Sequence, residues 1–367
     1  MKRRYKILNG FAILLLILIT ALSITIGYTA DCEPRLESTI NGESMMAIEA
    51  RCYGDSDVLE YVEVAKPVPG AKDLLVKVHA ASINPSNWHH MTGSPYVLRL
   101  MAGIGKPKNN AVGTDFSGVV VAVGNDVTKF KVGDAVFGGA RGAYAQYLTV
   151  REDRAVALKP ENVSHEQAAA VAVAGITALQ AVRDKGEISE GDKVLINGSS
   201  GGVGTHAVQI AKALGAEVIG VNSTRNVAMV KSIGADHVID YTVEDYTTQN
   251  IQYDVIIDMV GNNSLSENID LLSPGGRLVV VGGKKGDWIA PFVTPIQRLF
   301  MQPFVDHEIL SFIASLNQPD MDVLAQLMQE GKLKPVVGHR FELSEVAAAM
   351  DLSGSRRAQG KIIITIE

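Results

Sequence analysis

A glycine-rich turn between a strand-like run and a helix-like run constrains the fold of this chain most. Lys193–Asn197 is a short apolar run that predicts a buried strand, and the turn Asn197-Gly-Ser-Ser-Gly-Gly-Val-Gly204 follows at once. Thr205–Leu214 has the apolar spacing of a helix, and Glu217–Val221 predicts the next strand. Strand, glycine turn, helix and strand within about thirty residues are typical of a dinucleotide-binding unit.

The residues of this turn suit the binding of a pyrophosphate. The amino terminus of the following helix offers free N–H groups and the positive end of its dipole. Gly201 lets the backbone approach the phosphates, and Gly204 lets the helix pack closely on the sheet. We predict that the turn binds the cofactor through five residues, with a serine where the first glycine of the fingerprint is usual: Ser199, Gly201, Gly202, Val203 and Gly204.

The end of the second strand favours NADP(H) over NAD(H). An NAD site usually places an acidic residue about 20 residues past the glycine turn, to hold the ribose hydroxyls. Val221–Asn226 contains no acidic residue. Ser223, Thr224 and Arg225 offer two hydroxyls and a guanidinium instead, which suit a 2′-phosphate. The alternative is that Arg225 only begins a solvent-facing helix.

The α/β pattern continues towards the C-terminus. Further strands are predicted at residues 237–240, 253–259, 277–281 and 308–314, with helices between them. The carboxyl ends of parallel strands line the ligand crevice of such a sheet. We therefore predict that four residues after these strands flank the nicotinamide and its ribose: Val260, Gly261, Gly282 and Gly283. Tyr241, which follows the strand at 237–240, is also predicted to contact the cofactor.

The flanking segments predict a second, β-rich domain. Short strand-like stretches separated by turn residues occupy much of residues 46–171, and the chain ends in an amphipathic helix and a last strand. A chain of 367 residues that is 47 % apolar can build two cores. We predict the β-rich domain over 46–171 and 316–367, with the cofactor domain inserted over 172–315. The net charge of −6 excludes a generally basic, nucleic-acid-binding surface.

Residues 1–30 predict a signal or anchor segment. Basic residues precede a stretch from Ile7 to Ala30 that carries no charge. As a helix this stretch would be roughly 36 Å long, enough for a hydrocarbon core of about 30 Å. A cleaved signal peptide and an uncleaved membrane anchor both fit, and the length favours the anchor. We predict membrane association through this single helix, followed by a polar tether over 31–45.

The side of the membrane stays open at this point. Positive charges before the segment and acidic residues after it place the body on the extracytoplasmic side, whereas the need for a nicotinamide cofactor favours the cytoplasm. The chain has two cysteines, Cys32 and Cys52. Two are too few for a disulfide framework or a four-cysteine zinc lobe.

Several stretches together resemble the medium-chain dehydrogenase/reductase superfamily, in its zinc-free, quinone-oxidoreductase-like branch. The resemblance covers residues 46–367, and the stretches that carry it are Val76–Pro85, Val112–Val120, Val132–Gly138, Ala169–Leu179, Asn197–Gly204 and Ala358–Lys361. It implies an α/β fold in which a doubly wound Rossmann domain is inserted in a GroES-like catalytic domain, with the active site between them. It also implies NADPH-dependent reduction of quinones, enones or carbonyls by a homodimer. The branch commonly has Ala or Ser at the position of Ser199.

The same resemblance suggests residues of the catalytic centre. Asn84 matches an asparagine near the nicotinamide, although an asparagine that closes a turn before Pro85 is the alternative. Thr177 and Lys361 match a threonine and a lysine near the cofactor. The branch commonly has an aspartate three positions after the asparagine, where this chain has Asn87.

The residues also argue against a catalytic zinc, which needs three protein ligands, commonly Cys and His. Ser82-Ile-Asn84 stands where zinc-dependent relatives carry a cysteine, and Gly113-Thr-Asp115 matches their Gly-His-Glu. We predict no metal site, so hydrogen bonds must stabilise charge on the substrate oxygen. Candidate donors of a proton or hydrogen bond are His89, Tyr96 and Tyr144.

Three functions follow from this reading. The first, which we favour, is an NADPH-dependent reductase of a lipophilic quinone or α,β-unsaturated carbonyl. The second is a zinc-free alcohol or carbonyl dehydrogenase that uses NADP. The third is a non-catalytic, membrane-associated protein that binds NADPH. Turnover on a panel of quinones, enones and aldehydes separates them.

Overall fold

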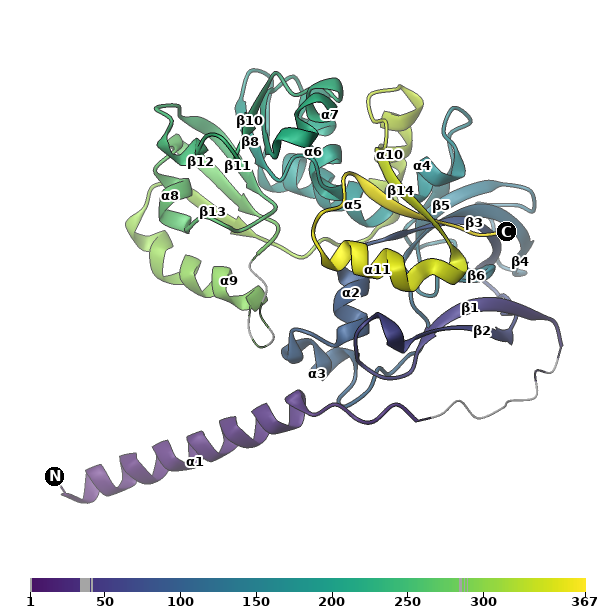
Figure 1. Cartoon of the computed structure of the whole chain (residues 1–367), viewed down its shortest axis with the longest axis horizontal. Coiled ribbons are helices and arrows are strands. Elements are labelled where there is room, and N and C mark those ends of the chain that lie inside the picture. The colour runs from purple at the N-terminus through teal and green to yellow at the C-terminus, as the bar shows by residue number, and fades with distance from the viewer. Residues whose placement is uncertain (1, 34–39, 41, 284–285, 287, 289) are drawn as a thin grey trace.

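The computed structural model describes residues 2–33, 40, 42–283, 286, 288 and 290–367, with only the backbone for 2–14 and 290–292. This part of the chain forms two sheet-based domains that lie side by side, and a long N-terminal helix projects from them (Figure 1). Residues 34–39 and 41 of the predicted tether lie outside the described residues.

The cofactor domain contains a six-stranded sheet in which every neighbouring pair of strands is parallel. Its order is β10-β9-β8-β11-β12-β13. The strands are β8 (Lys193–Asn197), β9 (Glu217–Asn222), β10 (His237–Asp240), β11 (Tyr253–Asp258), β12 (Leu272–Val280) and β13 (Glu308–Ser311). The order reverses between β8 and β11, which is where doubly wound sheets bind ligands. The predicted Rossmann architecture is confirmed.

Both faces of this sheet are buried, which explains the short continuous apolar runs of its strands. Successive side chains of a strand point to opposite faces. Val194 and Ile196 of β8 accordingly join the core under helix α6, whereas Leu195 joins the core on the other face. The helices of this domain are α5 (Ala172–Leu179), α6 (Gly202–Ala213), α7 (Val227–Ser232), α8 (Leu265–Ile269) and α9 (Ala290–Met301).

The catalytic domain is built on a seven-stranded sheet of order β14-β15-β3-β4-β5-β7, with β6 paired to β3. The strands are β3 (Asp73–Ile83), β4 (Asp115–Val123), β5 (Ala135–Gly139), β6 (Tyr147–Arg151), β7 (Val156–Leu158), β14 (Val337–Glu342) and β15 (Lys361–Thr365). The C-terminal strand β15 pairs with β3 near the start of the chain. This pairing returns the chain to its first domain after the Rossmann sheet.

Smaller elements complete the catalytic domain. A two-stranded sheet joins β1 (Ser44–Ala50) to β2 (Leu59–Ala65). The helices are α2 (Pro85–Thr92), α3 (Arg99–Ala102), α4 (His165–Ala169), α10 (Gln318–Gln329) and α11 (Val346–Gly354). Helix α2 directly follows β3, so the end of that strand and the start of the helix meet at one corner of the domain.

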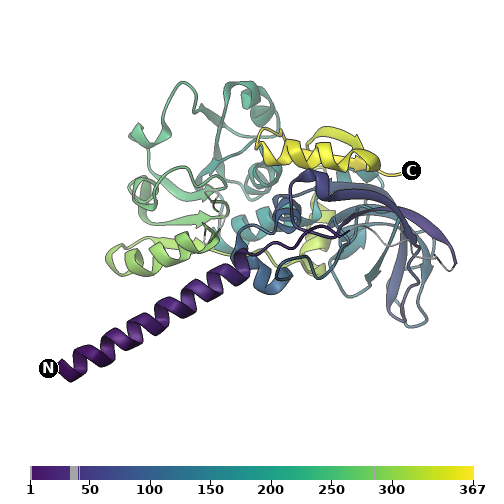
Figure 2. The same ribbon diagram turned by 60° about the horizontal axis from the view of Figure 1, so that its bottom comes forward.

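The N-terminal helix α1 (Lys2–Gly27) projects away from both domains in Figures 1 and 2. In the part of the chain that the structure describes, no helix is both long and apolar enough to cross a membrane. The predicted membrane-associated location is therefore wrong, and the predicted transmembrane anchor and membrane partner find no support in the described residues.

The segment after α1 is fixed to the body in two ways that the sequence did not predict. Cys32 and Cys52 form a disulfide bond. The guanidinium of Arg99, a buried side chain, donates hydrogen bonds to the carbonyl oxygens of Ile26 and Tyr28, at 3.3 and 2.8 Å. These carbonyls lie at the C-terminal end of α1, where helices leave acceptors unpaired.

Candidate functional site

The glycine turn leads from β8 into α6 and presents backbone rather than side chains. Gly201 precedes the first turn of α6, and no side chain caps the helix there. A Cβ on Gly204 would lie 2.1 Å from the carbonyl oxygen of Gly198, so only glycine fits between the helix and the turn. The N–H groups of the first helical turn, at Gly202 and Val203, are the kind that bind phosphate oxygens.

Ser199 lies in this turn but faces the sheet. Its side chain is fully buried, and its hydroxyl donates to the carbonyl oxygen of Val221 and the side-chain oxygen of Asn222, at 3.1 and 2.9 Å. Ser199 therefore joins the turn to the end of β9. The hydroxyl of Ser199 shapes the glycine turn, here called the phosphate cradle. Because that hydroxyl is buried against β9, only the backbone of Ser199 is left to contact a cofactor.

The turn before β15 crosses directly over the glycine turn. Gly360 donates its N–H to the carbonyl oxygen of Ser200 at 2.9 Å, and Gly201 and Gly360 form an isolated parallel bridge. A Cβ on Gly202 would lie 2.9 Å from Cδ of Lys361. The catalytic domain thus touches the phosphate cradle itself, and this contact brings Lys361 beside it.

Lys361 and Asn84 meet in a fully buried polar cluster under the cradle. The ammonium of Lys361 donates to Oδ1 of Asn84 at 2.5 Å and to the carbonyl oxygen of Ile83 at 2.9 Å. The carboxylate of Asp115 lies 3.5 Å from the same ammonium and accepts a hydrogen bond from Nδ2 of Asn84 at 2.9 Å. The structure therefore brings together two of the predicted site residues and adds Asp115.

Asp115 connects this cluster to two further elements. Its carboxylate accepts from the hydroxyl of Ser82 at 3.0 Å and from the backbone N–H of Val173 at 3.0 Å, near the start of α5. Thr177, one turn further along α5, donates its hydroxyl to the carbonyl oxygen of Val173. Burial lowers the pKa of Lys361, and the nearby Asp115 opposes that shift.

Tyr144 lies behind the cluster. Its side chain is fully buried, and its hydroxyl contacts Oδ1 of Asn87 and the carbonyl oxygen of Ser82, at 3.0 and 3.1 Å. Oδ1 of Asn87 also accepts from the backbone N–H of Asn84, at 2.8 Å. Burial raises the pKa of Tyr144 well above its ordinary value. This geometry gives Tyr144 a positioning role at the start of α2, while a role as proton donor remains a prediction.

His89 and Tyr96 lie further along the same segment, and both are half-buried. Nδ1 of His89 is 2.6 Å from the carbonyl oxygen of Ser94. The ring of Tyr96 packs edge-on against Trp288 at 5.0 Å between centroids and stacks under the guanidinium of Arg99. Tyr96 thus lies at a contact between the two domains. Among the described hydrogen bonds, none joins His89 or Tyr96 to the buried cluster around Asn84.

Three arginines gather past the end of β9. Nη2 of Arg225 donates to the carbonyl oxygen of Arg357 at 2.7 Å, and the neighbouring Arg356 reaches the carbonyl oxygen of Gly283 at 3.4 Å. Arg356 and Arg357 belong to the turn before β15, more than 130 positions after Arg225, so spacing along the chain could not predict this contact. Ser223 joins this end through Asn226, whose amide also contacts the hydroxyl of Ser200.

Thr224 contacts the end of β10. Its hydroxyl lies 2.9 Å from that of Thr242, which donates to the carboxylate of Asp240. A hydrogen bond from Thr224 itself is the largest cause that lowers the pKa of Asp240. An ionised carboxylate therefore lies on the β10 side of this end. Tyr241, next to Asp240, is 61 % exposed.

The ends of β11 and β12 form the other half of the crevice. Asp258, buried at the end of β11, accepts from the N–H groups of Val260 and Gly261, both at 2.9 Å, and from the amide of Asn197. A Cβ on Gly282 would lie 1.9 Å from the carbonyl oxygen of Met259, and Gly283 follows it into the crevice. Asp258 thus fixes the loops at the switch point. This role could not be predicted from the sequence, because a single aspartate forms no motif.

These features fit a bound nicotinamide dinucleotide. The free N–H groups of α6, the glycines at the strand ends and the arginines past β9 supply a phosphate cradle, close backbone approach and cationic charge, in the order that such a molecule needs. The described residues hold no group of three or more His, Cys, Asp and Glu side chains placed to bind a metal ion. The absence of a zinc site stays a prediction.

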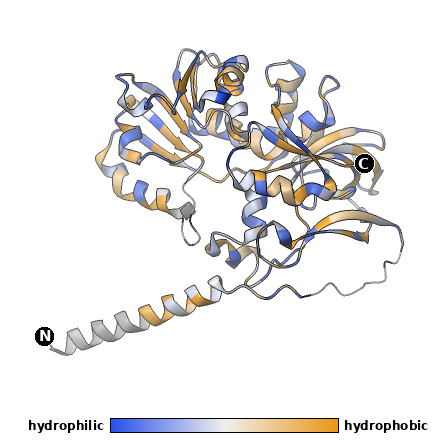
Figure 3. Cartoon of the chain, in the orientation of Figure 1, coloured by the Kyte–Doolittle hydropathy of each residue, from blue (hydrophilic) through white to orange (hydrophobic). Residues whose placement is uncertain are grey.

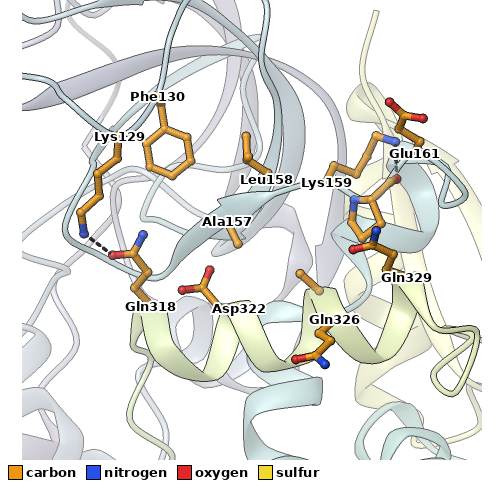
Figure 4. Close-up of a pocket in the computed structure, with 12 residues that line it drawn as sticks. Lys129, Phe130, Ala157, Leu158, Lys159, Glu161, Gln318, Asp322, Gln326 and Gln329 are labelled. Atoms are coloured by element: carbon orange, nitrogen blue, oxygen red, sulfur yellow. Dashed lines mark hydrogen bonds between the residues drawn. The ribbon is translucent and has the colours of Figure 1, made fainter.

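A wide hollow of about 510 Å³ lies elsewhere, between α10 and the strand β7 (Figure 4). Its two lysines are already engaged: Lys129 donates to the side chain of Gln318, and Lys159 donates to the carbonyl oxygens of Pro160 and Val163. None of the predicted site residues lines this hollow.

Comparisons with known proteins agree with this geometry. A family model described as "Alcohol dehydrogenase GroES-like domain" matches residues 70–161, and one described as "Zinc-binding dehydrogenase" matches residues 233–364. The quinone oxidoreductase of Homo sapiens is 32 % identical over 334 residues, which cover 88 % of this chain and 98 % of the relative.

Solved structures show the same likeness over the whole fold. The quinone oxidoreductase from Coxiella burnetii has a TM-score of 0.78 at 32 % identity and covers 89 % of this chain and 100 % of its own. A structure titled as an NAD-dependent alcohol dehydrogenase has a TM-score of 0.75 at 29 % identity, with 88 % and 100 % covered. The chain belongs to the medium-chain dehydrogenase/reductase superfamily, in its quinone-oxidoreductase-like branch.

Proposed function

We propose that this chain is a zinc-independent, NADPH-dependent oxidoreductase that reduces a quinone or an α,β-unsaturated carbonyl compound. The observation that carries the proposal is the contact between the two domains, where Lys361 and Asn84 lie buried beside the phosphate cradle. Residues of the catalytic domain that are predicted to contact the nicotinamide therefore lie next to the glycine turn of the cofactor domain. The quinone oxidoreductases among the relatives support the substrate class.

The cofactor, when bound, supplies a hydride, which adds to the substrate together with one proton. A quinone then becomes a hydroquinone, and an enone becomes a saturated ketone. The protein must hold the ring and exclude water. Asp115 and Lys361 fix both ends of the Asn84 amide, so that this side chain forms a rigid polar floor. His89 and Tyr96 are the proposed sources of a hydrogen bond or proton.

The preference for NADPH rests on the arginines past β9. The guanidinium of Arg225 bonds to the backbone carbonyl oxygen of Arg357, and no carboxylate follows β9 directly. A bidentate arginine–phosphate contact is among the stronger hydrogen-bonded contacts in proteins. Asp240 lies nearby but is held by Thr242. These features support contacts of Ser223, Thr224 and Arg225 with a 2′-phosphate.

The test is a titration of the purified full chain with NADPH and NADH, followed by fluorescence. We expect tighter binding of NADPH. Arg225→Ala should weaken NADPH binding by roughly 10–100-fold, the loss expected for a charged hydrogen bond, and should change NADH binding much less. Arg154→Ala, an exposed arginine in the catalytic domain, is the matched control. Equal affinities for the two cofactors would refute the assignment to NADPH.

Turnover is then measured at 340 nm with quinones, enones and aldehydes. Oxidation of NADPH by quinones or enones supports the proposal, and activity confined to alcohols and simple aldehydes would favour a zinc-free alcohol dehydrogenase. The likeness to a structure titled as an alcohol dehydrogenase makes this the second candidate. Binding without turnover would favour a non-catalytic protein. A homodimer is also proposed, and light scattering of the same preparation measures it.

A further inference from the structure

An apolar groove of about 470 Å³ lies between the end of α1 and Trp288. We propose that this groove binds the hydrocarbon chain of the quinone substrate, an alkyl or isoprenoid tail attached to the ring. The inference rests on the proposed function and adds to it the class of quinone that the enzyme prefers. The lining residues are Ile19, Thr20, Ser23, Ile24, Gly27, Tyr28 and Trp288.

The lining favours an apolar ligand. None of these residues carries a charge, and the hydroxyl of Thr20 already donates to the carbonyl oxygen of Leu16 at 2.8 Å. Ile24, Tyr28 and Trp288 are 69 %, 59 % and 45 % exposed. Large apolar side chains that gather on a surface in this way commonly mark a binding site. Figure 3 shows hydrophobic residues along the described part of α1 that leads to the groove.

The wall of the groove that α1 forms is fixed to the catalytic domain. Arg99 holds the end of α1 through the carbonyl oxygens of Ile26 and Tyr28, while the rings of Tyr53 and Tyr96 stack on its guanidinium at 4.6 and 4.4 Å. Ala30 donates its N–H to the carbonyl oxygen of Gly105 at 2.9 Å. The α1 wall is therefore anchored on the catalytic domain.

The opposite wall belongs to the segment that leaves the nicotinamide end of the crevice. Trp288 is five residues after Gly283, a separation of at most about 18 Å along the chain. Its ring packs against Tyr96, the residue predicted to face the substrate, and a Cβ on Gly27 would lie 3.2 Å from it. The groove thus borders Tyr96, one of the residues predicted to donate a proton or hydrogen bond to the substrate. A volume of 470 Å³ falls within the roughly 300–1,000 Å³ typical of small-molecule pockets.

The first experiment compares two quinones with the same dimethoxy-methylbenzoquinone head, one without a chain and one with a decyl chain. The full chain is saturated with NADPH, and kcat/KM is measured for both. We expect the decyl homologue to be favoured by roughly tenfold or more, since each buried methylene contributes roughly fourfold. Ile24→Asn should lower this ratio by roughly fivefold or more, because it replaces an apolar wall with an amide. Val68→Asn, at an 87 % exposed apolar residue between β2 and β3, is the matched control.

The second experiment measures binding without turnover. The chain has two tryptophans, so Trp88→Phe leaves Trp288 as the only indole, and quinones quench indole fluorescence. Quenching should saturate at a lower concentration of the decyl quinone than of the chainless one, and Ile24→Asn should remove that difference.

The outcomes separate the two proposals. Turnover of quinones with a decyl-to-chainless ratio near one, or a ratio that Ile24→Asn leaves unchanged, would overturn the groove alone. Absence of turnover with every quinone, with quenching by neither homologue, would overturn the proposed function as well. A Trp288 signal that changes with protein concentration rather than with chain length would assign the groove to a second copy of this chain.

Discussion

The ammonium of Lys361 lies 2.5 Å from the amide oxygen of Asn84, a residue 277 positions earlier in the chain. The contact joins the first residue of β15 to the residue between β3 and α2. Both side chains are buried, and Asp115 lies within 3.5 Å of the same ammonium. Because the glycine turn touches the same lysine, this contact holds the cofactor cradle and the catalytic domain together.

Replacing Lys361 with methionine should strongly destabilise the fold. The change leaves the carboxylate of Asp115 buried without its cationic partner, and breaking a buried pair in this way costs about 3–5 kcal/mol. Adding Asp115→Asn to Lys361→Met should recover much of that loss, because no buried charge then remains. The measurement is urea unfolding followed by fluorescence. Lys193→Met, at a lysine 3.9 Å from Glu217 on the surface, is the control, and an equal loss there would contradict the role of burial.

Asn84→Ala should impair catalysis more than cofactor binding. The amide takes part in the buried cluster at the predicted nicotinamide face, and misplacement of reacting groups can cost roughly 10–100-fold in rate. We therefore expect kcat with a quinone to fall by about that factor, with a small change in the NADPH dissociation constant. Asn162→Ala, which removes an amide bonded to the end of α10, should leave kcat unaffected. A loss confined to NADPH affinity would show that Asn84 only shapes the cradle.

The cofactor domain could be predicted from sequence because its signals are local. Strand, turn and helix from Lys193 to Leu214 are contiguous, and the predicted helix corresponds to most of α6. The differences lie where local patterns compete. We predicted a helix between the strands at 253–259 and 277–281, whereas α8 ends at Ile269 and β12 already begins at Leu272. The pairing of Leu272 with Tyr253 on β11 overrides the helical spacing there.

The remaining site residues depend on contacts between distant segments. The guanidinium of Arg225 donates to the carbonyl oxygen of Arg357 across 132 positions, and Asp115 meets Lys361 across 246, so spacing along the chain cannot reveal either pair. The disulfide between Cys32 and Cys52 likewise joins the segment after α1 to the segment after β1. The apolar run at the N-terminus led to a prediction that the structure does not support. Its composition predicted a membrane span, whereas the structure shows that Arg99, from another part of the chain, bonds the C-terminal end of this run to the body.

Arg99→Met should loosen the end of α1. The guanidinium donates to the carbonyl oxygens of Gly93, Ile26 and Tyr28, and hydrogen bonds to charged groups contribute roughly 1.5–3 kcal/mol each. The amide of Ala30, bonded to Gly105, should therefore exchange with solvent deuterium at least about tenfold faster. Arg340→Met, at an exposed arginine paired with Glu166, is the control. Unchanged exchange at Ala30 would mean that the disulfide alone holds this segment.

The stability of the fold should fall with acid because of His206, a fully buried histidine on α6. Burial, aided by the charge of Lys361, lowers its pKa from 6.5 to about 4, although a bond to the carbonyl oxygen of Gly202 opposes the shift. Between these two pH values the unfolded chain binds a proton that the native state does not. The contribution of the neutral His206 side chain to the free energy of unfolding is therefore intact above pH 6.5, and it is lost as the pH falls to about 4.

The variant His206→Leu isolates this effect from the other titrating groups, including His165, whose pKa is also lowered to about 4 by burial. The free energy of unfolding of the wild type relative to the variant should fall by roughly 1.4 kcal/mol per pH unit below 6.5. Urea unfolding at a series of pH values measures it, with His237→Leu, at a 70 % exposed ring, as control. Parallel curves for the wild type and His206→Leu would contradict the assignment, because a buried neutral imidazole must lose stability wherever the unfolded chain is protonated.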